Sequence, residues 1–133
     1  MIVVDASAVL AIYLNEAERE RFLEIVTSAP AAEMAPVNAW EVLARAQSLN
    51  GPAGAGEAEA LLSALGVAVP PSTMDDVRAA VAAFARFGRN MPAKLNLGDC
   101  FAYALARKRN APLLFKGDDF TQTDVTRASP SAM

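Results

Sequence analysis

The chain opens with a short apolar run that ends in a carboxylate, and this feature constrains the fold more than any other. Residues 1–4 have the composition of a buried strand, Asp5 follows directly, and the apolar segment 6–14 has helical character. The same order returns late in the chain, where the apolar run 112–115 leads into the charged segment 116–119. Because ligands bind beyond the carboxyl ends of strands in open α/β sheets, both acidic segments are expected at one functional edge.

The composition indicates a single globular domain whose chemistry does not use histidine. The 133 residues are 53% hydrophobic and 20% charged, which favours a packed core over disorder. Because the chain has no histidine and only one cysteine, Cys100, it cannot form imidazole-based catalytic sites or Cys/His zinc sites. The net charge of −3 argues against broad electrostatic attraction to nucleic acid, although a local contact stays possible.

Nothing in the sequence points to a membrane. No basic leader precedes the first apolar run, Asp5 interrupts that run, and no apolar stretch is long enough to cross a bilayer. We therefore expect a soluble domain that works in the cytoplasm.

Extended and helical segments alternate along the chain. Strands are predicted at residues 1–4, 31–36, 67–69 and 112–115. Helices are predicted at residues 6–14, 16–28 (with Asn15 as N-cap), 38–50, 57–65, 74–87 (capped by Thr73) and 98–109, and residues 51–56 are predicted to form a loop. This alternation predicts a parallel sheet with helices on both faces. Residues 1–126 are expected to form one domain, and residues 127–133 are expected to fray because they have little apolar content.

Four acids could meet at the carboxyl edge of this sheet. Asp5 and Asp118 follow predicted strands, whereas Glu41 and Asp99 lie near the starts of predicted helices. Each acid also has a structural interpretation, because acids cap helices, favour the first helical turn and form plain turns. For Glu41 that alternative is as strong as the functional one, since Asn38 and Glu41 have the spacing of a capping box.

Taken together, the four acids predict a cation site. Two carboxylates 4 Å apart repel each other by about 4 kcal/mol at an effective dielectric constant near 20, so some would protonate if no cation were bound. A ligand set made only of oxygen atoms favours Mg²⁺ or Mn²⁺, and such an ion could activate water and neutralise charge on a phosphodiester. The hydroxyl of Ser7 could cap the first helix, or it could contact a phosphate or a metal-bound water.

Four motifs, in this order and spacing, resemble the PIN-domain ribonucleases and, more narrowly, the VapC toxins of bacterial toxin–antitoxin pairs. The motifs are Ile2-Val3-Val4-Asp5-Ala6-Ser7-Ala8, Val37-Asn38 through Glu41-Val42, Leu97-Gly98-Asp99-Cys100-Phe101-Ala102-Tyr103-Ala104 and Leu113-Leu114-Phe115-Lys116-Gly117-Asp118-Asp119-Phe120. The resemblance covers nearly the whole chain. It implies a PIN-like three-layer α/β/α sandwich with a central, mostly parallel sheet of four to five strands.

The resemblance further implies a metal-dependent endoribonuclease that acts as the toxin of its pair. One or two Mg²⁺ or Mn²⁺ ions would be bound by Asp5 and Asp99, with Glu41 and Asp118 completing or orienting the ligand shell through water. A metal-activated water would then hydrolyse RNA phosphodiester bonds. The implied partners are an RNA substrate, a second copy of the chain, and a cognate antitoxin that covers the active-site groove.

One position departs from the family pattern and leaves alternatives open. Many relatives carry Ser or Thr where this chain has Lys116, so Asp119 could share the role of the fourth acid. Lys116 itself could contact the scissile phosphate or be a solvated loop lysine. A catalytically silent PIN-fold module that binds RNA or protein is the alternative function. A dehalogenase-like phosphatase is disfavoured, because that chemistry requires a second acid where Ser7 stands.

Overall fold

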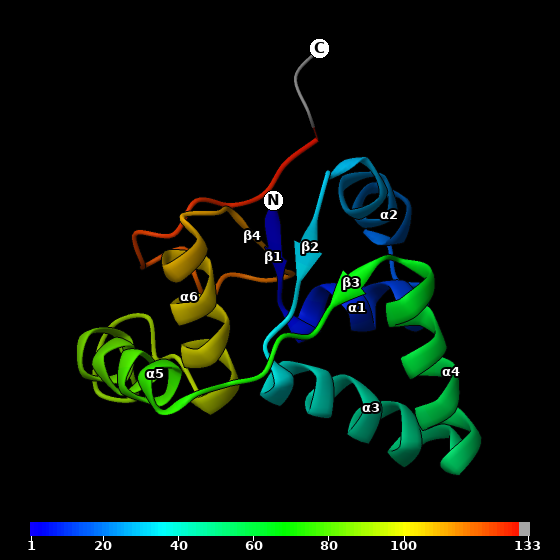
Figure 1. Cartoon of the computed structure of the whole chain (residues 1–133), viewed down its shortest axis with the longest axis horizontal. Coiled ribbons are helices and arrows are strands. Elements are labelled where there is room, and N and C mark those ends of the chain that lie inside the picture. Colours follow the sequence, from blue (N-terminus) through cyan, green and yellow to red (C-terminus); the bar gives the residue numbers. More distant parts are fainter. Residues whose placement is uncertain (131–133) are drawn as a thin grey trace.

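A four-stranded parallel sheet forms the centre of the molecule in the computed structural model, which describes residues 1–130 (Figure 1). Its strands are β1 (Ile2–Val4), β2 (Ala32–Glu33), β3 (Val67–Ala68) and β4 (Leu113–Leu114). The spatial order is β3-β2-β1-β4, and every neighbouring pair is parallel. β1 therefore lies between β2 and β4, so the residue that follows β1 leaves the sheet at its interior.

Within residues 1–130, six helices cover the two faces of the sheet, as the alternation of segments predicted. They are α1 (Ala6–Tyr13), α2 (Arg19–Ser28), α3 (Pro36–Asn50), α4 (Pro52–Ala64), α5 (Met74–Phe87) and α6 (Leu97–Arg109). Figure 1 shows α1 to α4 on one side of the sheet and α5 with α6 on the other. The predicted α/β/α architecture with a four-stranded parallel sheet is thus confirmed.

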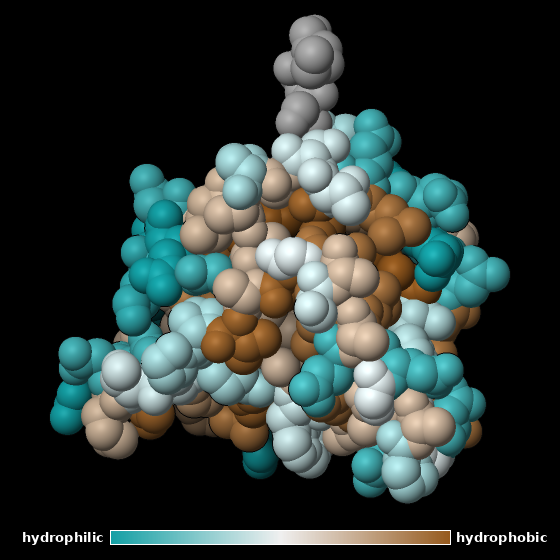
Figure 2. All heavy atoms as spheres, turned by 45° about the vertical axis from the view of Figure 1, so that its right-hand side comes forward, coloured by the Kyte–Doolittle hydropathy of each residue, from teal (hydrophilic) through white to brown (hydrophobic). Residues whose placement is uncertain are grey.

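The core has two halves because successive residues of β1 point to opposite faces. Ile2 and Val4 pack with side chains from α1 to α4, whereas Val3 packs with side chains from α5, α6 and the segment after β4. All three are buried. In the space-filling view, polar side chains surround the periphery while apolar ones gather near the middle of the face shown (Figure 2). The burial of β1 on both faces fixes the position of Asp5.

The segment predicted as a loop at residues 51–56 is helical beyond its first residue. Gly51, with φ of 73°, makes the turn by itself, and Pro52 begins α4 with the φ value that suits a first helical position. Gly54 serves close packing and does not break the helix, since a Cβ there would collide with the backbone of Ala46 in α3. The glycine-rich composition was therefore misinterpreted as a loop.

The start of α2 and the C-terminal tail also differ from the prediction. Asn15 has φ of 57° and lies in the turn after α1, so it is not the N-cap of α2, which begins at Arg19. The tail expected to fray from residue 127 is still paired at its start, because the Ala128 N–H donates to the Leu113 carbonyl at 2.8 Å. Residues 131–133 of that tail lie outside the described residues.

Along residues 1–130, the helices are too short or too polar to span a bilayer.

Candidate active site

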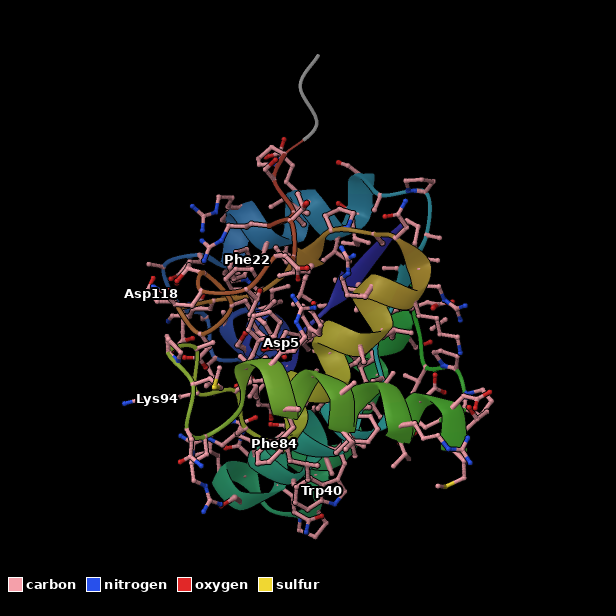
Figure 3. The ribbon with its side chains drawn as sticks, turned by 90° about the vertical axis from the view of Figure 1, so that its left-hand side faces the viewer. Asp5, Phe22, Trp40, Phe84, Lys94 and Asp118 are labelled. Carbon is pink, nitrogen blue, oxygen red and sulfur yellow. The ribbon has the colours of Figure 1, made fainter. Side chains whose placement is uncertain are left out.

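Asp5 lies at the carboxyl end of β1, where it is 5% exposed and also serves as the N-cap of α1. Its Oδ2 accepts hydrogen bonds from the Ser7 amide at 3.1 Å and the Ser7 hydroxyl at 2.6 Å. Burial raises the pKa of Asp5, while the hydrogen bonds from Ser7 oppose that rise and the charge of Asp119 adds to it. The predicted capping role is confirmed, and Figure 3 shows Asp5 in the interior of the molecule.

Ser7 links Asp5 to the segment that follows β4. Its Oγ donates to Asp5 and accepts a hydrogen bond from the Lys116 amide at 3.0 Å. The Lys116 ammonium forms ion pairs with Glu16 at 3.0 Å and Glu18 at 3.5 Å. The Lys116 side chain is therefore a partly exposed lysine paired with two glutamates that lie between α1 and α2.

Glu41 projects from α3, and the capping-box alternative for it is wrong. The helix begins at Pro36, so Asn38 lies within its first turn and does not cap it. The Asn38 side-chain amide instead donates to Glu41 Oε1 at 2.9 Å and to the Gly98 carbonyl at 3.0 Å. A Cβ at residue 98 would collide with the Glu41 carboxylate. Burial raises the pKa of Glu41, and the charge of Asp5 raises it further.

Asp99 lies in the first turn of α6 and completes a capping box with Asn96. The Asp99 amide donates to Asn96 Oδ1 at 2.9 Å, and the Asn96 amide donates to Asp99 Oδ2 at 3.2 Å. Burial raises the pKa of Asp99 to about 7, with the charges of Asp5, Asp119 and Glu41 adding to the rise. Sequence inspection missed Asn96, although Asn-x-x-Asp is the spacing that identifies such a box.

The two acids after β4 differ in their influence on this cluster. Both Asp118 and Asp119 are exposed, and Figure 3 shows Asp118 at the outer edge of the molecule, away from Asp5. The charge of Asp119 raises the pKa of both Asp5 and Asp99, whereas Asp118 is not among the main causes for either. Electrostatically, Asp119 is therefore grouped with Asp5 and Asp99.

The donor set suits a hard cation in its chemistry. Within residues 1–130, no three acidic or cysteine side chains already stand together in metal-binding positions. The acids nevertheless offer oxygen ligands only, and their mutual repulsion contributes to the raised pKa values. A divalent ion would offset that repulsion, and oxygen ligands are those that Mg²⁺ and Mn²⁺ favour.

Cys100 follows Asp99 but has no catalytic features. It is 2% exposed, and burial together with the charge of Asp99 raises the pKa of its thiol. A raised thiol pKa opposes formation of the nucleophilic thiolate. Cys100 is therefore a small buried residue of the core.

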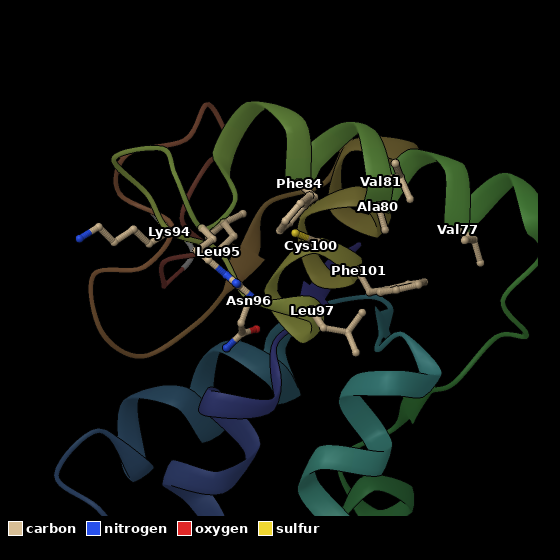
Figure 4. Close-up of a pocket in the computed structure, with 11 residues that line it drawn as sticks. Val77, Ala80, Val81, Phe84, Lys94, Leu95, Asn96, Leu97, Cys100 and Phe101 are labelled. Atoms are coloured by element: carbon tan, nitrogen blue, oxygen red, sulfur yellow. The ribbon is translucent and has the colours of Figure 1, made fainter.

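An apolar groove of about 600 Å³ lies beside the acids, between α5 and α6 (Figure 4). We call it the α5–α6 groove; its apolar lining includes Val77, Ala80, Val81, Phe84, Leu97 and Phe101. Asn96 also lines it, so the residue that caps α6 and holds Asp99 borders both the groove and the acids. Val81, Phe84 and Leu97 are more than half exposed. The groove is therefore an apolar surface that adjoins the acidic one.

Comparisons with known proteins agree with the fold and the motifs. The model of the PIN domain family matches residues 2–125. Ribonuclease VapC42 of Mycobacterium tuberculosis is 38% identical over 128 residues, which cover 95% of this chain and 98% of VapC42. The crystal structure of M. tuberculosis VapC20, a sarcin–ricin loop cleaving toxin, has a TM-score of 0.80 at 20% identity, covering 98% of this chain and all of the other. A toxin–antitoxin complex from Klebsiella pneumoniae has a TM-score of 0.75 at 17% identity, covering both chains fully.

Proposed function

The chain belongs to the PIN domain family and, within it, to the VapC ribonucleases, and from this membership we propose that it is a toxin that hydrolyses RNA phosphodiester bonds with Mg²⁺ or Mn²⁺. The observation that carries the proposal is the convergence of acids from distant elements. Asp5, Glu41 and Asp99 come from β1, α3 and α6, and the charges of Asp5 and Glu41 raise the pKa of Asp99. With all three acids charged, such an arrangement is unfavourable, and it is relieved either by protonation or by a bound cation.

In the proposed site, some residues would bind the ion and others orient the residues that bind it. When bound, the ion supplies activation of water and neutralisation of charge on the phosphodiester. Asp5 and Asp99 are the buried acids that would hold it, and Ser7 and Asn96 fix the orientation of their carboxylates by hydrogen bonds. Because these acids have raised pKa values, ion binding would release protons, so we expect the affinity for the ion to rise with pH.

We propose that Asp119 shares the role of the fourth acid with Asp118. The support is electrostatic, because the charge of Asp119 contributes to the pKa of both buried aspartates. Both loop acids are exposed, so either could turn toward an ion when it binds.

We also propose that the protein forms a homodimer and pairs with an antitoxin that covers the acidic edge. The α5–α6 groove supports a second copy as its occupant, since exposed apolar patches mark protein interfaces. The acids support an antitoxin that offers a basic side chain. Helix α1 is not part of this surface, because its apolar side chains Val9 and Ile12 are buried.

Sedimentation of the purified chain tests the homodimer. Phe84→Arg places a charge in the groove and should yield a monomer. Val69→Arg is the control, because Val69 is exposed but does not line the groove. If Phe84→Arg sedimented as the wild type does, the groove would not be the dimer interface.

The ribonuclease proposal is tested by inducing the wild-type chain and its Asp5→Asn variant in cells that lack the antitoxin. New 5′-phosphate RNA ends are then mapped across the transcriptome. Asp75→Asn is the matched control, because Asp75 is an exposed aspartate whose ion pair is with Arg78. Ends that appear with the wild type and with Asp75→Asn, but not with Asp5→Asn, support the proposal. No new ends from a stable, expressed wild type would favour the silent binding module.

A further inference from the structure

Asn38 has an unusual environment for an amide in the first turn of a helix. It is completely buried, and within residues 1–130 the only other polar or charged side chains classed as buried are Asp5 and Asp99. Its amide nitrogen donates to Glu41 Oε1 at 2.9 Å and to the Gly98 carbonyl at 3.0 Å. Neither bond caps α3, and the bond to Gly98 connects α3 to α6.

The same side chain carries a structural disadvantage. Its Oδ1 is buried and has no hydrogen-bond donor in the described part of the chain. A buried acceptor without a partner destabilises the folded state, because it has lost its hydrogen bonds to water. An apolar side chain would avoid that disadvantage. Local choices that oppose stability are expected at functional positions.

The two bonds of Asn38 join the residues that carry two of the acids. Gly98 directly precedes Asp99 at the start of α6, while Glu41 lies on α3. The Glu41 carboxylate occupies the space that a Cβ of residue 98 would need, so α6 approaches it closely. Asn38 therefore contacts the Glu41 carboxylate and the backbone beside Asp99 through the same nitrogen.

We propose that Asn38 is a positioning residue that holds the Glu41 carboxylate against the first turn of α6, so that Glu41 and Asp99 stay correctly placed for a divalent ion. Its role toward the ion rests on the proposed function, whereas its hold on Glu41 does not. An aspartate at this position would have no amide hydrogen and would repel Glu41. A serine would keep one donor on a shorter side chain.

The experiment compares Asn38→Ala and Asn38→Ser with Asn50→Ala. Asn50 is a matched control because it lies on the same helix and its amide also donates to a side chain, the Tyr13 hydroxyl at 2.9 Å. Mn²⁺ binding to each purified protein is measured by calorimetry without RNA. Unfolding is measured in chelator, kcat and KM are measured on the RNA found by end mapping, and crystal structures of the wild type and Asn38→Ala are determined.

We expect Asn38→Ala to bind Mn²⁺ about ten- to a hundredfold more weakly, as is typical when a group that orients a metal ligand is removed. The value of kcat should fall while KM changes little, and Asn38→Ser should fall between Asn38→Ala and the wild type. The midpoint of unfolding in chelator should be unchanged or higher. Asn50→Ala should match the wild type in Mn²⁺ affinity and kcat.

The crystal structures separate failure of this inference from failure of the proposed function. If Glu41 leaves Gly98 in Asn38→Ala, the hold on Glu41 is established, even if the wild type neither binds Mn²⁺ nor cleaves RNA. In that case the proposed function alone fails. If Glu41 keeps its place, or if Asn38→Ala binds Mn²⁺ as tightly as a wild type that does bind it, the positioning role is overturned.

Discussion

Helices α5 and α6 both begin with a capping box, but the pKa of the aspartate in the box is lowered in α5 and raised in α6. In α5, the Asp76 amide donates to the Thr73 hydroxyl, and the Asp76 carboxylate accepts from the Thr73 amide at 2.8 Å. In α6, Asn96 and Asp99 exchange the corresponding bonds. Each aspartate is the third residue of its helix and closes a capping box. The backbone alone would therefore give the two carboxylates the same properties.

Their neighbours make them different. Hydrogen bonding from Thr73 and from Lys108 holds the pKa of Asp76 below its usual range, and Lys108 pairs with it at 2.9 Å. Burial raises the pKa of Asp99 to about 7, and three other carboxylates add to the rise. The cap determines where a carboxylate lies, whereas the elements packed around it determine whether it stabilises the fold or prepares a site.

The largest expected difference between the two capping boxes is in ribonuclease activity. Asn keeps an acceptor for the cap, so Asp99→Asn and Asp76→Asn change the charge at each box with little change in shape. We expect Asp99→Asn to lower kcat/KM by more than about a hundredfold, beyond the effect of removing a group that only orients a ligand. Asp76→Asn should stay within about threefold of the wild type. Cleavage of the RNA found by end mapping measures both, and equal losses would contradict the comparison.

The second difference is the sign of the effect on stability in chelator. Asp99 has a folded pKa near 7 and an unfolded pKa near 4, so the folded state binds its proton more tightly and loses stability as pH rises between these values. Asp99→Asn should therefore stabilise the protein above pH 7, by about 1.4 kcal/mol or more. Below pH 4 that gain should vanish.

Asp76→Asn should do the reverse. A lowered folded pKa contributes stability that is present above about pH 4, the unfolded value, and is lost as pH falls through the folded pKa. Removing this charge should destabilise the protein at pH 7 by about 0.5 to 1 kcal/mol, because the first turn of α5 loses a favourable negative charge and Lys108 loses its ion pair. Urea unfolding across pH 3–8 measures both variants, and a loss of stability in Asp99→Asn at pH 8 would contradict the raised pKa.

Sequence reasoning predicted the elements better than the contacts between them. The strand that ends at Asp5, and the cap at Thr73, follow from local patterns, and both are found. The roles of Asn38 and Gly54 could not be predicted in this way, because each depends on a contact with another helix. Asn38 contacts α6, and Gly54 packs against α3 across the turn at Gly51. Asn38 has the spacing of a cap, yet it bonds to Gly98, sixty residues away. Local patterns identify candidate acids, but only tertiary packing shows how they are held.

The two loop acids, Asp118 and Asp119, should differ in their effect on the site around Asp99, whose pKa is raised. Since the charge of Asp119 raises the pKa of Asp99, Asp119→Asn should weaken Mn²⁺ binding and lower kcat/KM by about tenfold, the lower end of effects for groups near a metal. Asp118→Asn should have a smaller effect. The two single variants and the double variant are compared by calorimetry and cleavage assays. A larger loss in Asp118→Asn would restore Asp118 as the main fourth acid.

The smallest expected effect comes from removing the Lys108 ammonium, the positive charge that pairs with Asp76. Lys108→Met breaks the ion pair with Asp76 but leaves the capping box intact, so α5 should lose only about 0.5 kcal/mol of stability, as exposed pairs usually do. Salt should shrink this loss, because it screens exposed charges. Urea unfolding at low and high ionic strength measures the effect, with ribonuclease activity as the second readout. If Lys108→Met lowered kcat/KM as Asp99→Asn does, the two boxes would not be independent, and the division between a stabilising cap and a site-building one would fail.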